Sequence, residues 1–84
     1  MTYIMENTVT VGSGKVETVG KVSDICGANT FFLSGKLSLG AGSNDSKCIV
    51  VSTNWNWNQY ISILNMSSVS VDIKYPITIA YINI

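Results

Sequence analysis

Apolar and polar residues alternate between Thr30 and Leu39, and this stretch gives the clearest structural signal in the chain. Successive side chains of a β-strand point to opposite faces of the sheet, so a period of two predicts a strand with one buried face. The apolar set is Phe31, Leu33, Leu37 and Leu39, and the residues that alternate with it are Phe32, Ser34, Lys36 and Ser38. We therefore expect a central strand here, with the apolar set in the core.

Shorter β-branched or alternating segments make up most of the remaining chain. They predict further strands at Thr8–Val11, Val16–Val22, Lys47–Thr53, Tyr60–Leu64, Val69–Tyr75 and Ile77–Ile84. Turn-forming Gly, Ser, Asn and Asp separate the strands, notably at Ser23–Asn29 and Gly40–Ser46. About seven strands, with turns about every 8–12 residues, are typical of an antiparallel sandwich. No segment has the period of a helix, so we predict an all-β fold, a small antiparallel β-sandwich or jelly-roll-like barrel with almost no helix.

Two of these segments are apolar on both faces. Lys47–Thr53 contains four successive apolar residues, which predicts a strand covered on both sides. Ile77–Ile84 is either the inner strand of a two-sheet core or a strand that packs one face against a symmetry mate. The chain is expected to form a single domain over residues 1–84, in which residues 1–7 are a lead-in from a larger protein or a first edge strand.

Composition argues against several classes of partner. The chain is 46% apolar and 12% charged, has neither Arg nor His, and has a formal net charge of zero. It therefore lacks the positive charge that binds nucleic acid or an anionic membrane. No apolar run approaches the roughly 20 residues of a spanning helix, and the first residues lack the pattern of a signal peptide. We expect synthesis in the cytoplasm, with neither nucleic acid nor membrane as partner.

Candidate catalytic and metal-binding groups are sparse and scattered. The carboxylates are Glu6, Glu17, Asp24, Asp45 and Asp72. Without His, and with no paired carboxylates in sequence, no acid–base machinery is predicted. Two cysteines are too few for structural zinc. Cys26 and Cys48 would either form a disulfide or remain buried thiols, and buried thiols are the interpretation adopted here. We expect a non-enzymatic protein without cofactor or metal.

The segment from Asn54 to Tyr60 is the candidate binding site. Its candidate carbohydrate-binding residues are Asn54, Trp55, Asn56, Trp57, Asn58 and Tyr60. If the segment is extended, both Trp rings share one face and the Asn amides the other. Aromatic rings stack on the apolar faces of sugars, and amides hydrogen-bond their hydroxyl groups. The alternative is that one or both Trp side chains close the end of the core, with the indole N–H bonded to the backbone.

Several stretches resemble the receptor-binding tip domains of phage tail fibres. Asn7–Val22 resembles the opening hairpin of such domains, and Gly27–Leu39 resembles the Gly-aromatic start and alternating strand that follow. The Asn/Ser loop at residues 43–46 and the closing strand Ile77–Ile84 are also similar. The resemblance implies a jelly-roll-like homotrimer on the virion or another extracellular surface that binds host cell-surface glycans or wall polymers. It assigns no binding residue.

These observations together predict a non-enzymatic, oligomeric domain that recognises cell-surface carbohydrate. Repetition of a weak site in an oligomer, with a trimer favoured, would raise avidity without new contacts. Three alternatives remain at this point: the cell-wall-binding module of a phage endolysin, a structural cap for trimerisation or folding, and a small toxin or inhibitor held by a disulfide.

Overall fold

The computed structural model describes residues 1–38, 47–74 and 76–84, and confirms the predicted all-β fold. Its elements in chain order are β1 (Thr2–Ile4), β2 (Val9–Val11), β3 (Val16–Lys21), α1 (Val22–Cys26), β4 (Thr30–Leu37), β5 (Cys48–Trp55), β6 (Asn58–Asn65), β7 (Val71–Ile73) and β8 (Pro76–Asn83). The described part of the chain thus has eight strands. The predicted turn cluster Gly40–Ser46 lies outside the described residues, as do Leu39 and Tyr75.

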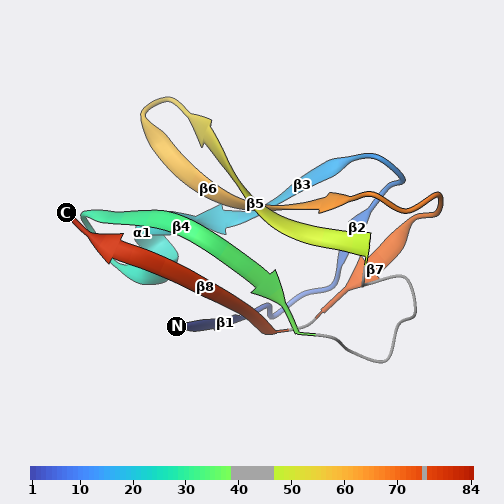
Figure 1. Cartoon of the computed structure of the whole chain (residues 1–84), viewed down its shortest axis with the longest axis horizontal. Helices are drawn as coiled ribbons and strands as arrows, with labels where there is room; N and C mark the ends of the chain where they lie inside the picture. The colour runs from blue at the N-terminus through green and yellow to red at the C-terminus, as the bar shows by residue number, and fades with distance from the viewer. Residues whose placement is uncertain (39–46, 75) are drawn as a thin grey trace.

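Two antiparallel sheets contain these strands (Figure 1). The large sheet has the order β1-β8-β4-β5-β6-β3, and the small sheet pairs β2 with β7. Residues 1–7 contain an edge strand, as one of the two interpretations predicted, because Thr2–Ile4 pairs with β8. The hairpin of β5 and β6 projects beyond the rest of the sheet, at the upper left of Figure 1. Its tip is therefore free on several sides.

Residues from both sheets and from α1 form one apolar core. Its fully buried members are Ile61, Ile63, Ile73, Ile77, Ile79, Val11 and Val22. The loop predicted at Ser23–Asn29 is wrong for its first residues, because α1 forms a single helical turn that ends at Cys26, with Gly27 as its C-cap. This turn directs Val22 into the core, and five residues are too few to show a helical period in the sequence.

Asn65, at the end of β6, connects the two sheets from a fully buried position. Its Nδ2 donates to the carbonyl oxygens of Val11 and Val69, each at 2.8 Å. Its Oδ1 accepts from the backbone N–H of Ser67 at 2.9 Å and from the hydroxyl of Ser67 at 2.6 Å. Every hydrogen-bonding position of the amide is therefore used inside the protein.

The strand predicted at Thr30–Leu39 exists, but the prediction of which face is buried is wrong for the first half of the strand. The register of β4 against β8 shifts between Phe32 and Ser34, which makes Leu33 the extra residue of a β-bulge. The bulge reverses the alternation, so Phe32 is only 4% exposed while Phe31 and Leu33 face outward. After the bulge, Leu37 is buried as predicted.

Two further strands have one buried face rather than two. In β5, Cys48 and Val50 are buried, whereas Ile49 between them is 40% exposed. The prediction that Lys47–Thr53 is covered on both faces is therefore wrong for the single chain, because the sheet has a packed layer on one side of this strand. In β8, Ile77 and Ile79 are buried and Ile82 is exposed. A two-sheet core does not cover β8 on both faces.

Candidate functional site

The segment around the two tryptophans is a tight hairpin turn and not an extended strand. Trp55 closes β5 and pairs with Asn58 at the start of β6. Asn56 and Trp57 between them have φ angles of 50° and 65°. Two central residues with positive φ are the signature of a type I′ turn, whose twist matches that of the flanking strands. The predicted arrangement, with both Trp rings on one strand face, is therefore wrong, because the chain reverses between them.

Both indole rings lie on the surface. Trp55 is 73% exposed and Trp57 is fully exposed. The alternative in which a Trp closes the end of the core is thus wrong. For Trp57 the position also has a cost, since a bulky residue at positive φ is disfavoured by about 1–2 kcal/mol. The backbone of this turn would be more stable with Gly at position 57.

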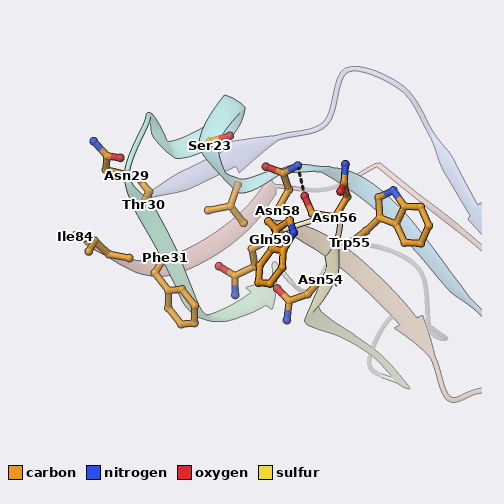
Figure 2. A pocket seen from close by; sticks show the side chains of 12 residues that line it. Ser23, Asn29, Thr30, Phe31, Asn54, Trp55, Asn56, Asn58, Gln59 and Ile84 are labelled. Carbon is orange, nitrogen blue, oxygen red and sulfur yellow. Dashed lines mark hydrogen bonds between the residues drawn. The ribbon is translucent and has the colours of Figure 1, made fainter.

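A groove of about 890 Å³ runs beside the hairpin tip. Its described lining residues are Val22, Ser23, Asn29, Thr30, Phe31, Asn54, Trp55, Asn56, Trp57, Asn58, Gln59 and Ile84. One wall is the hairpin tip, and the other is formed by the start of β4, the residue after β8 and the first turn of α1. Figure 2 shows Phe31 and Ile84 on one side, Asn54 and Asn56 on the other, and Gln59 between the two walls.

The groove exists because β4 and β5 diverge. Within the described residues, the ladder between these strands contains the pair Gly35 and Val50. In the same described part of the chain, the segment of β4 that precedes Gly35 is not paired with β5. The approach at this pair is very close, since a Cβ on Gly35 would lie 2.6 Å from Cγ1 of Val50. Beyond it, the side chain of Gln59 from β6 reaches across the gap. Gln59 Oε1 accepts from the N–H of Phe32 at 2.7 Å, and Gln59 Nε2 donates to the oxygen of Phe32 at 3.2 Å.

The far wall of the groove is fastened by local hydrogen bonds. The hydroxyl of Thr30 donates to the carbonyl oxygen of Gly27 at 2.7 Å, and the N–H of Ile84 donates to the oxygen of Asn29 at 2.6 Å. Asn29 has a φ of 58°, in the left-handed region that Asn tolerates better than most residues. The start of β4 and the residue after β8 are therefore held together as one surface.

The groove offers aromatic faces and amides without charge. None of its described lining residues has an ionisable side chain. Within the described chain, the side-chain amides of Asn54 and Asn56 make no hydrogen bond. The side-chain amide of Asn58 is used, because its Nδ2 donates to the backbone oxygen of Asn56 at 3.1 Å (dashed in Figure 2). Two amides are thus available to a ligand, and the amide of Gln59 is used by the protein.

The six residues predicted to bind carbohydrate are brought together only in part. Asn54, Trp55, Asn56, Trp57 and Asn58 line the groove. Tyr60 instead lines a second hollow of about 330 Å³, with Thr18, Thr53, Asn54 and Trp55. Sequence reasoning missed the opposite wall of the groove: the β4 bulge turned Phe31 outward, and only the pairing of β4 with β8 brings Ile84 beside it.

The cysteines and carboxylates do not contribute to this site. Within the described residues no disulfide joins Cys26 to Cys48, as predicted, but only Cys48 is buried and Cys26 is half-buried. Burial raises the pKa of the Cys26 thiol, an effect that the positive charge of the N-terminus partly opposes. The described acidic and cysteine side chains form no group of three that could hold a metal ion. No helix in the described ranges has the length and apolar character needed to cross a membrane.

Comparison with protein-family models, with curated proteins and with solved structures finds no match to this chain. The groove and the hairpin tip are therefore the features of this chain that bear on its function.

Proposed function

We propose that the chain is a non-enzymatic carbohydrate-binding domain, and that the tip of the β5–β6 hairpin and its groove hold a neutral glycan. The observation that carries the proposal is the position of Trp57. A fully exposed indole occupies a turn position with a φ of 65°, where it makes the fold less stable. Strained residues of this kind concentrate at binding sites, where the surrounding structure supports them.

The surroundings of Trp57 support a sugar as the ligand. Indole and phenyl faces cover the apolar C–H face of a pyranose, and the available amides of Asn54 and Asn56 both donate to and accept from hydroxyl groups. Lining side chains without charge favour a neutral ligand over a phosphorylated or sulfated one. The volume of about 890 Å³ lies within the usual range of roughly 300–1,000 Å³ for small-molecule sites.

Oligomerisation completes the proposal, with a homotrimer as the favoured assembly. Phe31 and Ile82 are paired neighbours on the outer face of β4 and β8, and both are exposed, as is Leu33. Burial of apolar residues such as Leu33 and Ile82 between copies would remove a surface that monomers rarely expose. Several shallow sites on one particle would then act together on a cell-surface or wall polymer. This arrangement suits a tail-fibre tip on a virion, or a wall-binding module of an endolysin.

Two rival functions lose the observation on which they depended. A trimerisation or folding cap required the tryptophans in the core, whereas both lie on the surface. A disulfide-held toxin or inhibitor required a bond between Cys26 and Cys48, which the described structure does not contain.

An array of neutral and charged glycans, probed with the purified protein, tests the proposal. We expect binding to neutral glycans, and loss of that binding in the double variant Trp55→Ala/Trp57→Ala. The matched control is Met66→Ala, which removes an exposed apolar side chain from a different turn. Absence of binding to every glycan, or equal loss in the control, would overturn the proposal.

A further inference from the structure

The second hollow lies on the opposite face of the hairpin from Gln59. Side chains of directly paired residues on neighbouring strands share a face. Asn54 pairs with Gln59, and both residues line the groove. Thr53 pairs with Tyr60, one position further along each strand, so both point to the other face and line the second hollow.

Trp55 connects the two hollows. Together with Asn54 it lines both of them, at the end of β5 and next to the turn. β4 does not separate the hollows here, because its pairing with β5 at Gly35 and Val50 lies several residues away. The edge of β5 at Asn54 and Trp55 is therefore where the two hollows share lining residues.

The second hollow has the same chemical character as the groove. Tyr60 and Trp55 provide aromatic surface, and none of the described lining residues is charged. Thr53 and Thr18 add hydroxyl groups, both of them near the buried Ser62, whose hydroxyl lies 2.8 Å and 3.4 Å from theirs. The hydrogen bond between Thr53 and Ser62 restricts the rotamer of Thr53, so this part of the hollow is preorganised.

We propose that the ligand is a linear neutral oligosaccharide that crosses the edge of β5, with some sugar units in the groove and others in the second hollow. This inference rests on the proposed function and adds the length of the ligand to it. Trp55 lies at the crossing, Trp57 and Phe31 belong to the groove, and Tyr60 belongs to the second hollow. A single terminal sugar fills one hollow only.

Titration with neutral oligosaccharides of increasing length tests the inference. The probes are β-1,4-linked glucose and N-acetylglucosamine oligomers of one to six units, together with the same size series of any glycan found on the array. We expect affinity to rise about tenfold or more once the chain spans both hollows, from one additional aromatic contact and its hydrogen bonds. Affinity that does not depend on length would overturn the inference and leave the proposed function intact.

Variants of the second hollow separate its contribution from that of the groove. Tyr60→Leu keeps apolar bulk but removes the ring, and Thr18→Val removes one hydroxyl while keeping the shape. We expect both variants to lose the increase in affinity that longer chains give the wild type. Circular dichroism checks that each variant is folded. If Tyr60→Leu does not fold, Thr18→Val alone provides the test. An equal loss at every length would contradict the inference, and failure of the wild type to bind any glycan would overturn the proposed function as well.

Discussion

The side-chain amide of Gln59 hydrogen-bonds both backbone polar groups of Phe32 across the gap between β4 and the hairpin, at 2.7 Å and 3.2 Å. A side chain of β6 thus takes the role that the backbone of β5 would have in a continuous sheet. The two strands remain apart while the polar groups of Phe32 are satisfied. These two hydrogen bonds therefore fix the separation of β4 from the hairpin, and the groove between them is part of the folded structure.

Replacement of Gln59 by Leu is expected to reduce the free energy of unfolding by about 2–3 kcal/mol, because it leaves the N–H and C=O of Phe32 without partners. Urea denaturation measures this change. The matched control is Asn54→Ala, because Asn54 is directly paired with Gln59 but its side-chain amide makes no hydrogen bond in the described structure. We expect the control to alter stability by less than about 0.5 kcal/mol while it weakens glycan binding. Equal free energies of unfolding for the two variants would show that the hydrogen bonds of Gln59 to Phe32 do not stabilise the fold.

Replacement of Asn65 by Asp is expected to cost about 3 kcal/mol or more of unfolding free energy. The change keeps the shape of the side chain, but it removes the two donors to Val11 and Val69 and introduces a carboxylate at a fully buried position. Thermal denaturation should show a fall in Tm of roughly 12 °C or more for a domain of this size. Asn56→Asp makes the same chemical change at the exposed turn, and its Tm should stay close to that of the wild type. A small effect at Asn65 would contradict its role in connecting the sheets.

The thiol of Cys26 is expected to react slowly in the folded protein at pH 7, because burial raises its pKa and the reactive species is the thiolate. Its folded pKa lies above the unfolded value, so its contribution to stability is complete at neutral pH and declines as the pH rises through the folded pKa. Alkylation by iodoacetamide from pH 7 to pH 10, followed by mass spectrometry, should show slower modification of Cys26 in the folded protein than in urea.

The same alkylation tests whether the two cysteines are bonded. In urea without reductant, both Cys26 and Cys48 should be modified. Cys26→Ser is the control that assigns the rates to the two sites. Failure of both thiols to react in urea would reveal a disulfide and contradict the structure.

The sequence was sufficient to predict the class of fold but not which face of each strand is buried. Alternation over Thr30–Leu37 correctly identifies β4, because the strand period depends on local geometry. One inserted residue at Leu33 then reverses the phase, and this bulge depends on pairing with β8, a segment more than forty positions away in the chain. Hydrophobic periodicity contains no information about such a shift.

The candidate site was predicted in part, for a related reason. Aromatic and amide residues around Trp57 identify a binding segment from composition alone. The turn within the segment was missed because the most common two-residue hairpin turns have Gly where this chain has Trp57. Tertiary contacts create the second wall of the groove, which contains Phe31 and Ile84. They also create the hydrogen bonds of Gln59 to Phe32. No local pattern in the sequence predicts them.

Replacement of Trp57 distinguishes a hairpin tip that binds a ligand from one that stabilises the fold. Trp57→Gly relieves the left-handed backbone strain, so the free energy of unfolding should rise by about 0.5–1 kcal/mol in urea denaturation. Trp57→Ala removes the ring but keeps a Cβ, so its stability should match that of the wild type. Both variants should lose affinity for the neutral glycans that the wild type binds. A Trp57→Gly variant that is less stable than the wild type and binds glycan equally well would contradict the account.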